Sequence, residues 1–460
     1  MQAEHFDAIV IGAGQAGPAL AARLDQAGRK TAFIERQLMG GTCVNTGCIP
    51  TKTLVASARA AHVARRGAEY GFSAGEVRVD MRAVKARKDG VVGKSVAGLT
   101  GWVEGMKNVS LIRGHAKFTA PHTIAVNDRL LQADQVFINV GGRAVVPDLP
   151  GVQDVPYLTN TTMMGIDFLP EHLVIVGGSY IGLEFAQMYR RFGAEVTVVE
   201  RAPKLLPRED DDVAAEIRAI LEREGIELRT NAECMELHRK GDRIEIGLSC
   251  RQGPPVAEGS HLLLAVGRVP NTHDLGLDAA GVETDARGYI KVDDECRTSV
   301  EGVYALGDAN GRGAFTHTSY NDYEIVAANL LDGEQRRISD RIPAYALFID
   351  PPLGRVGMNE GEARASGKRV LVGKMPMTRV GRAREAGETQ GFMKVLVDAD
   401  TQLLLGASLL GLNADEIVHS LLDIMYARQP YTTIARAMHI HPTVTELVPT
   451  LLQSLKPLQA

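Results

Sequence analysis

Apolar and polar positions repeat one pattern twice along the chain. Residues 6–11 form an apolar run that predicts a buried strand, followed by a helix and by a second strand that ends at Glu35. The same succession begins again at residues 173–176 and ends with a strand over residues 195–200. Each succession of strand, helix and strand predicts a βαβ unit with parallel strands.

The rest of the chain gives a coarser pattern. Residues 36–115 are expected to be mostly helical with one special loop, and residues 116–150 alternate like short antiparallel strands. Two further buried strands are expected over residues 262–268 and 303–308. From Pro343 onward strands alternate with helices, which indicates a separate α+β domain.

The predicted fold class is therefore α/β, with two Rossmann-like dinucleotide-binding domains and a C-terminal α+β domain. A chain of 460 residues is long enough for two to four domains. The expected limits are residues 1–150 for the first part of the first dinucleotide-binding domain, 151–272 for the second such domain, 273–342 for the return to the first, and 343–460 for the C-terminal domain.

The first βαβ unit carries a glycine-rich turn between its strand and its helix. Gly12 makes the tight turn, Gly14 lets the backbone approach a pyrophosphate, and Gly17 lets the helix pack closely on the strand. The positive end of the helix then faces the phosphates, and Glu35 can accept hydrogen bonds from a ribose diol. This arrangement predicts a dinucleotide site.

The second unit repeats the arrangement with Gly177 and Gly182, while Ser179 replaces the middle glycine. Glu200 follows Gly177 by 200 − 177 = 23 residues, which equals the 35 − 12 = 23 residues between the first glycine and the acid of the first unit. Two matched dinucleotide sites imply electron transfer between two cofactors.

The choice of nicotinamide coenzyme stays open. Glu200 favours a free ribose 2′-hydroxyl and repels a 2′-phosphate, which predicts NADH. Arg201 and Arg208 follow closely, and either guanidinium could hold the 2′-phosphate of NADPH.

Composition excludes several classes of function. The chain has 45% hydrophobic and 23% charged residues, as folded proteins do, and 48 glycines, above the usual share of about 7%. The net charge is −5 and aromatic residues make up only 5%, so nucleic acid is not an expected partner. The N-terminus has no basic, apolar signal pattern and no apolar run approaches 18 residues, so we expect no membrane association and a cytoplasmic protein.

Five cysteines, an odd number, also favour a reducing compartment. Cys43 and Cys48 are five residues apart, and Gly47 permits the turn that would join them in a small disulfide. A thiol near a helix N-terminus and Lys52 would have a lowered pKa. The remaining cysteines are expected to be packed or solvated thiols: Cys234, Cys250 and Cys296.

These motifs, in this order, resemble those of the class I pyridine-nucleotide disulfide oxidoreductases, which include dihydrolipoamide dehydrogenase, glutathione reductase and mercuric reductase. The likeness covers nearly the whole chain and rests on both glycine fingerprints, residues 40–52 around the cysteine pair, Ala265-Val266-Gly267-Arg268-Val269-Pro270-Asn271, Ala305-Leu306-Gly307-Asp308 and His441-Pro442-Thr443. It implies FAD on the first fold, NAD(P)H on the second, and an obligate homodimer.

The resemblance also implies roles for single residues. Glu35 would hold the FAD ribose, Asp308 the ribityl and phosphate part, and Lys52, paired with Glu184, would lie near flavin N5. The set of expected cofactor-binding residues is completed by Thr42, Tyr180 and Gly267. One departure is residues 138–142, where Asn139 and its neighbours replace the hydroxyl-bearing turn usual in the family.

The same resemblance implies the catalytic roles. Cys48 would face the flavin and Cys43 would attack the substrate. His441 would act as the acid/base, oriented by Glu446 and delivered to Cys43 of the partner subunit, because a histidine titrates in the range that thiol exchange needs. No metal ion is expected at this site.

The electron acceptor is not fixed by the sequence. We favour a disulfide or another thiol-reactive oxidant, as for reductases of the reactive-chlorine-resistance type, with dihydrolipoamide dehydrogenase as the leading alternative. A mercuric reductase is disfavoured because no cysteine follows Cys296. A non-enzymatic flavoprotein redox sensor is the other alternative, and anaerobic reduction by NAD(P)H would separate it from an enzyme.

Overall fold

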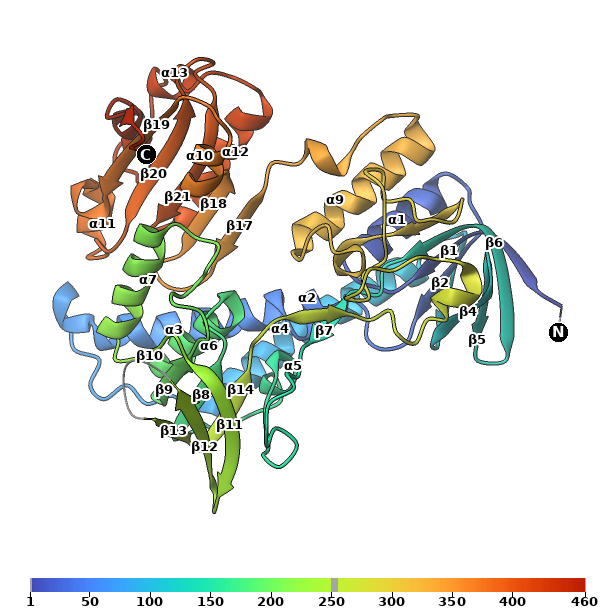
Figure 1. Ribbon diagram of the computed structural model, residues 1–460, viewed down its shortest axis with the longest axis horizontal. Coiled ribbons are helices and arrows are strands. Elements are labelled where there is room, and N and C mark those ends of the chain that lie inside the picture. The colour runs from blue at the N-terminus through green and yellow to red at the C-terminus, as the bar shows by residue number, and fades with distance from the viewer. Residues whose placement is uncertain (1, 250–254, 460) are drawn as a thin grey trace.

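Three sheets, each from a different part of the chain, form the frame of the molecule in the computed structural model (Figure 1). The structure describes residues 2–249 and 255–459. The expectation for Cys250 therefore lies outside the described residues, as does that for the Cys234 side chain.

The first sheet has the strand order β3-β2-β1-β6-β5-β4, with β16 added beside β6. β1, β2, β3, β6 and β16 run parallel, so the carboxyl ends of β1 and β2 meet at one edge. Helices α1 and α9 lie side by side over this sheet (Figure 1). Its elements are β1 (Glu4–Ile11), α1 (Ala16–Gln26), β2 (Thr31–Glu35), β3 (Val109–Arg113), β4 (Ala116–Ala120), β5 (Thr123–Val126), β6 (Arg129–Ile138), β16 (Val303–Ala305) and α9 (Thr316–Ala327).

The second sheet is parallel in the order β10-β9-β8-β14 and repeats the first βαβ unit. An antiparallel three-stranded sheet lies in the chain between β10 and β14, and a two-stranded ribbon connects the second sheet to the first domain. The elements are α5 (Asn160–Met163), β8 (His172–Val176), α6 (Tyr180–Phe192), β9 (Glu195–Val199), α7 (Asp211–Arg223), β10 (Glu227–Arg229), β11 (Glu233–Lys240), β12 (Arg243–Ser249), β13 (Val256–Gly259), β14 (His261–Leu264) and, in the ribbon, β7 (Gly142–Ala144) and β15 (Arg268–Pro270).

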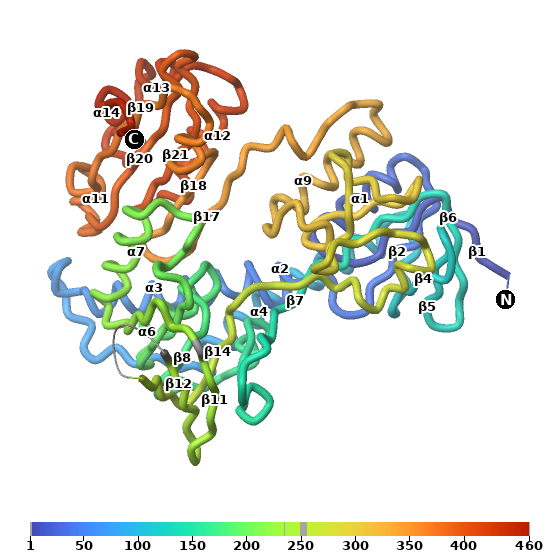
Figure 2. Tube along the Cα trace, viewed as in Figure 1, coloured from blue at the N-terminus to red at the C-terminus, as the bar shows by residue number. Residues whose placement is uncertain are grey.

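The third sheet is antiparallel and belongs to the C-terminal domain. After α9 the chain crosses in one pass to β17, which starts this sheet (Figure 2). Its elements are β17 (Ala344–Leu347), β18 (Leu353–Gly357), α10 (Glu360–Ala365), β19 (Val370–Pro376), α11 (Gly381–Glu385), β20 (Phe392–Asp398), β21 (Leu404–Leu410), α12 (Ala414–Tyr426), α13 (Thr432–Ala435), α14 (Val448–Leu452) and β22 (Lys456–Pro457).

The helices between β2 and β3 connect the first two domains. α2 (Gly41–Asn45) and α3 (Cys48–Arg65) follow β2, and α4 (Met81–Glu104) returns to β3. α3 packs against α6, and most residues of α6 are buried. The N-terminus of α3 is thereby fixed between the two dinucleotide folds. α8 (Leu277–Ala280) lies beside β4.

The predicted α/β fold class with two Rossmann-like units and an α+β C-terminal domain is confirmed. Residues 36–115 are mostly helical, as expected, and they also contain β3, which completes the edge of the sheet beside β2. Two details were wrong. The strand expected over residues 262–268 ends at Leu264, since the chain turns at Gly267, whose φ is 128°, before the ribbon begins at Arg268. The strand expected over residues 303–308 ends at Ala305, before a 3-10 turn. The division of the chain at residues 150, 272 and 342 stays a prediction.

Within the described residues, no helix combines the length and the apolar character that crossing a bilayer requires.

Candidate active site

One continuous cavity of about 2200 Å³ reaches from the first glycine turn to the second. It is large because the two βαβ units present the ends of their strands to the same space, with the start of α3 between them. Most of the residues expected from the sequence line it: Gly12, Gly14, Glu35, Thr42, Cys43, Cys48, Lys52, Gly177, Tyr180, Glu184, Glu200, Arg201, Gly267 and Asp308.

Gly17 and Gly182 lie behind the cavity wall, where the helices approach the turns. A Cβ on Gly17 would stand 2.3 Å from the carbonyl oxygen of Gly12, and one on Gly182 would stand 2.0 Å from that of Gly177. Any side chain there would push the helix away from its strand. Both glycines therefore permit close packing, as the sequence indicated.

Both helix N-termini fit the phosphates of a dinucleotide. Neither Gln15, before α1, nor Ser179, before α6, caps its helix with a side-chain hydrogen bond. In α1 the N–H of Gly17 donates to the carbonyl oxygen of Gly14 and Pro18 has no N–H, so the remaining N–H groups of the two first turns are the ones available to an anion. Glu35 stands at the end of β2 and accepts hydrogen bonds from the N–H groups of Ala13 and Gln37, both at 2.7 Å. The residues present therefore fit FAD on the first unit and NAD(P)H on the second.

Asn139 fixes the turn at residues 138–142, where the sequence departs from the family pattern. Its side chain is buried, and its amide donates to the carbonyl oxygen of Gly12 at 3.2 Å. Its backbone N–H donates to the carbonyl oxygen of Ile11 at 2.8 Å. An amide thus ties this turn to the first glycine turn.

Arg268 joins three parts of the cavity and was not assigned a role from the sequence. Its guanidinium lies 3.4 Å from the carboxylate of Asp308 and 3.4 Å from the hydroxyl of Thr42, and it donates to the carbonyl oxygen of Gly142. Arg268 belongs to the sequence motif around Gly267, but only the fold reveals its partners.

The two cysteines of the C-x4-C motif are both free thiols, half-buried at the junction of α2 and α3. A hydrogen bond from Cys43 lowers the pKa of Cys48 to about 6, helped by Thr316 and Lys52 and opposed by burial. The same hydrogen bond and burial raise the pKa of Cys43. At neutral pH the arrangement therefore favours a Cys48 thiolate beside a protonated Cys43.

Thr316 is a site residue that the sequence analysis missed. It is the first residue of α9, and its hydroxyl oxygen lies 3.1 Å from the sulfur of Cys48. The two residues are 268 positions apart in the chain. No local pattern marks Thr316, because its contact arises only when α9 packs beside the start of α3.

Lys52 and Glu184 meet across the packed pair of helices α3 and α6. The Lys52 ammonium lies 2.8 and 3.0 Å from the two oxygens of Glu184 and 4.5 Å from the centre of the Phe348 ring. The side chain of Glu184 is only 7% exposed, and it also accepts from the backbone N–H of Phe348 at 3.0 Å. The pairing that the resemblance implies is therefore present in the structure.

His441 and Glu446 form a pair that lies away from this cavity. The imidazole Nδ1 lies 2.8 Å from a carboxylate oxygen of Glu446, but neither residue lines the cavity. The His441 side chain is 80% exposed, and its neighbours Met438 and Ile440 are 99% and 80% exposed. A single chain thus does not bring His441 to Cys43.

Cys296 is fully buried in the core of the first domain, and burial raises the pKa of its thiol well above the ordinary value. It does not line the cavity. The expectation of a packed thiol fits this position.

Comparison with known proteins gives the same organisation. The family model for pyridine nucleotide-disulphide oxidoreductases matches residues 6–322, and the model for the dimerisation domain of that family matches residues 343–452.

Named relatives align with the chain over most of their length. The chain is 36% identical to the probable pyridine nucleotide-disulfide oxidoreductase RclA of Escherichia coli, over 96% of this chain and 97% of that protein. It is 35% identical to a dihydrolipoyl dehydrogenase of Thermus scotoductus, over 96% and 95%. It is 30% identical to a mercuric reductase of Lysinibacillus sphaericus, over 95% and 82%.

Among solved structures, the HOCl-induced flavoprotein disulfide reductase RclA from Escherichia coli superposes with a TM-score of 0.89 at 35% identity, covering 97% of this chain and 99% of that one. A Cu(II) complex of the same reductase gives the same TM-score and identity over 98% and 99%.

Proposed function

The chain belongs to the pyridine nucleotide-disulphide oxidoreductase family, whose members use FAD and NAD(P)H, and from this premise we propose that it reduces a disulfide or another thiol-reactive oxidant through the Cys43–Cys48 pair. NAD(P)H supplies a hydride, which carries two electrons, and FAD provides the chemistry that passes both electrons to a disulfide. The product is a Cys43 thiol and a Cys48 thiolate.

The thiol steps balance without any further reductant. Cys43, deprotonated by a base, attacks one sulfur of the substrate disulfide and releases the first substrate thiol. Cys48 then attacks the sulfur of Cys43, which reforms the Cys43–Cys48 disulfide and releases the second thiol. The two electrons delivered by the coenzyme thus leave in two substrate thiols.

The observation that carries the proposal is the place of the Cys43–Cys48 pair: both thiols line the cavity that the two dinucleotide folds share, with Thr316 and the Lys52–Glu184 ion pair in the same cavity wall. The hydrogen bond from Cys43 lowers the pKa of Cys48 to about 6. A stabilised thiolate at this junction fits a reaction in which electrons enter from the dinucleotides and leave through the sulfur of a cysteine.

The remaining assignments follow from the same premise. Glu35 would bind the FAD ribose, Asp308 with Arg268 the middle of FAD, and Glu200 the coenzyme ribose. Lys52, fixed by Glu184, would lie beside the flavin ring.

His441 and Glu446 would act in the second copy of a homodimer. The dimerisation domain assigns the chain to a dimer-forming family. The high exposure of His441, and of the apolar side chains Met438 and Ile440 beside it, supports contact with a second copy. His441 of the partner subunit would then be the base for Cys43.

The favoured acceptor class is a small thiol-reactive oxidant, because a relative with 35% identity over nearly the whole chain is described as induced by HOCl. Dihydrolipoyl dehydrogenase is the second candidate, because relatives of that name match at 35% identity over 96% of this chain.

A turnover screen tests the proposal. Purified FAD-loaded protein would be assayed anaerobically for NADH and NADPH oxidation with hypothiocyanous acid, lipoamide, glutathione disulfide, Hg(II) and quinones, and in reverse with dihydrolipoamide and NAD⁺. Preference for hypothiocyanous acid supports the favoured class, and fast reverse turnover supports the dehydrogenase. If a Cys43→Ser variant oxidised the coenzyme as fast as the wild type with every acceptor, the proposal would be overturned.

A further inference from the structure

Glu209 is a buried carboxylate that lies behind the wall of the cavity. Its side chain is 0% exposed. One oxygen accepts hydrogen bonds from two phenols, that of Tyr180 at 2.9 Å and that of Tyr345 at 2.7 Å. The other oxygen lies 3.5 Å from the Nε of Arg355 and makes no hydrogen bond. Burying a carboxylate charge costs free energy, which its few hydrogen-bond and ion-pair partners must offset.

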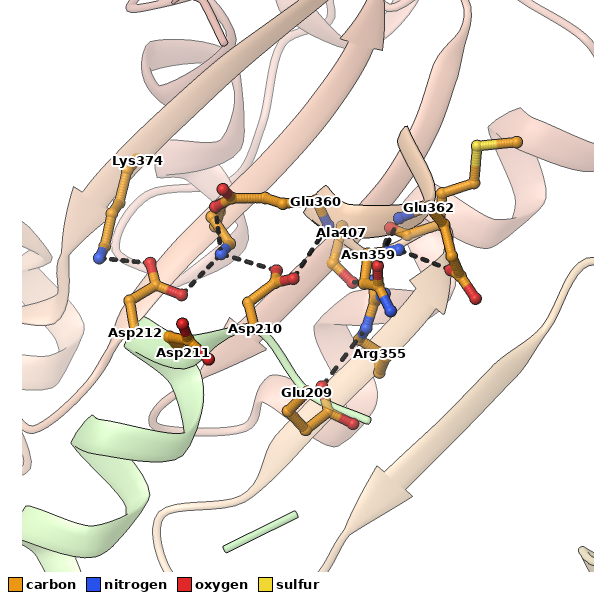
Figure 3. Close-up of polar contacts among 12 residues, drawn as sticks. Glu209, Asp210, Asp211, Asp212, Arg355, Asn359, Glu360, Glu362, Lys374 and Ala407 are labelled. Carbon is orange, nitrogen blue, oxygen red and sulfur yellow. Dashed lines mark hydrogen bonds and ion pairs between the residues drawn. The ribbon is translucent and has the colours of Figure 1, made fainter. Parts of the chain in front are cut away.

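The partners of Glu209 come from two domains. Tyr180 is the first residue of α6 in the second dinucleotide fold, whereas Tyr345 and Arg355 lie on β17 and β18 of the C-terminal domain. Arg355 is itself only 3% exposed and donates to the carbonyl oxygens of Met358 and Ala407 at 2.9 and 3.2 Å. Figure 3 shows Arg355 pointing from its strand to Glu209. The carboxylate therefore ties the two domains together at this point.

The residues after Glu209 fasten the same segment. Asp210 accepts from the backbone N–H of Glu360 at 2.9 Å and lies 2.7 Å from the Lys394 ammonium. Asp212 lies 2.7 Å from the same ammonium and also pairs with Lys374 (Figure 3).

Among the described residues, Asp210, Asp212 and Glu360 are the one acidic group close enough to hold a metal ion. The Lys394 ammonium already lies within 2.6 to 2.7 Å of all three carboxylates and occupies the position between them. This group therefore serves as an anchor for the segment.

The side chain of Tyr180 forms part of the cavity wall. It lines the space shared by the two dinucleotide sites, directly after the second glycine turn and one helical turn before Glu184. Its ring meets the ring of Tyr345 edge-on at 5.6 Å and that of Phe315 edge-on at 6.2 Å. Phe315 and Tyr345 are stacked on each other at 5.5 Å. With its hydroxyl bound to Glu209, the Tyr180 ring is held against this aromatic wall.

Glu209 also belongs to the segment that begins at Glu200 and Arg201, which line the same cavity. One carboxylate is thus bonded to Tyr180 in the cavity wall and belongs to the loop that, under the proposed function, would hold the ribose end of the coenzyme. Burial and Glu209 raise the pKa of Tyr180, so its phenol remains a hydrogen-bond donor at all physiological pH values.

We propose that Glu209, supported by Tyr345, is a positioning residue for the nicotinamide coenzyme: it holds the Tyr180 ring at the cavity wall and thereby keeps the space for the nicotinamide open. The inference rests on the proposed function, since it needs a coenzyme in the second fold. Glu209 itself does not touch the cavity and acts through Tyr180.

Tyr345→Phe is the mildest test, because it removes one hydroxyl and keeps the ring that stacks on Phe315. Glu209→Gln removes the charge and serves as a second variant. Tyr189→Phe is the matched control, since Tyr189 is a buried tyrosine on the same helix that has no contact with Glu209. Thermal unfolding and the flavin absorbance spectrum check that each variant folds and holds FAD.

The main measurement is titration of the oxidised, FAD-loaded enzyme with NAD⁺ and NADP⁺ by calorimetry, together with KM for the coenzyme and for the disulfide. We expect Tyr345→Phe and Glu209→Gln to weaken coenzyme binding about threefold to tenfold, the effect of one lost hydrogen bond, with the KM for the disulfide unchanged. Tyr189→Phe should match the wild type.

A double-mutant cycle separates positioning through Tyr180 from a general structural effect. In a Tyr180→Phe background, Tyr345→Phe should weaken coenzyme binding no further, because the phenol that Glu209 holds is already gone. Additive losses, equal shifts in both KM values, or unchanged coenzyme affinity in both folded variants would overturn the inference. If the wild type itself bound no coenzyme, the proposed function would be wrong as well as this inference.

Discussion

Glu35 and Glu200 occupy the same place in the two dinucleotide-binding folds. Glu35 accepts from the N–H groups of Ala13 and Gln37, and Glu200 accepts from those of Gly178 and Ala202, at 2.6 to 2.7 Å in all four contacts. In each fold one carboxylate oxygen accepts a hydrogen bond from the glycine turn, and the other accepts one from the residue two positions after the acid. A carboxylate has about four acceptor sites, so both can still receive a ribose diol.

This equivalence predicts that NADH is the preferred coenzyme. The Glu200 carboxylate is fixed at the ribose position, where it repels a 2′-phosphate. Steady-state kcat/KM for NADH should exceed that for NADPH, and Glu200→Gln should narrow the difference. A preference of about 100-fold for NADPH, equal to about 2.7 kcal/mol, would contradict the argument.

Arg201 supplies the control for this prediction. It is exposed at the cavity rim, as is Arg208. If either guanidinium assists a 2′-phosphate, Arg201→Ala or Arg208→Ala should lower kcat/KM for NADPH and leave that for NADH nearly unchanged. Equal losses with both coenzymes would show a role unrelated to the phosphate.

The thiolate of Cys48 should be controlled by Thr316. The pKa of Cys48, about 6, lies below the ordinary value of a thiol, so the thiolate is present above pH 6 and is lost as the pH falls through 6. A hydrogen bond to a charged group contributes about 1.5 kcal/mol, and one pKa unit corresponds to about 1.4 kcal/mol. Thr316→Val should therefore raise this pKa by about one unit.

The measurement is a pH titration of the long-wavelength thiolate–flavin absorbance band of the reduced enzyme. Thr316→Ser keeps the hydroxyl and should titrate like the wild type. A Thr316→Val midpoint equal to that of the wild type would mean that the 3.1 Å contact does not stabilise the thiolate.

The sequence revealed the parts of the site that a local pattern records. The two glycine turns, their acids and the C-x4-C motif each lie within one short stretch, so spacing alone identified them. Thr316, Arg268 and Glu209 could not be recognised in this way, because their partners are brought to them by packing between elements far apart in the chain. The edge strand β3 was missed for a similar reason, since its pairing with β2 closes the sheet across the α2–α4 insertion.

Cys43 is predicted to be the thiol that reacts with substrate. Its pKa is raised, so it is the protonated partner that a base must activate, while Cys48 remains the thiolate. Cys43→Ser should abolish reduction of every disulfide tested and keep anaerobic flavin reduction by NADH. Cys296→Ser is the matched control, because that buried thiol lies outside the cavity and its removal should leave turnover intact. Full turnover in Cys43→Ser would show that the role belongs to another group.

The last prediction is that each active site is completed by the second subunit. His441 and Glu446 are paired and exposed outside the cavity that holds Cys43, so within one chain the base and the thiol are apart. A two-fold dimer would place each His441 at the Cys43 of the partner subunit. Cys43→Ser and His441→Ala homodimers should both be inactive. When equal amounts are mixed under conditions that exchange subunits, half of the dimers are mixed and each contains one intact site, so about a quarter of wild-type activity should return. If mass measurement shows mixed dimers and activity stays at background, His441 acts within its own chain or has no catalytic role.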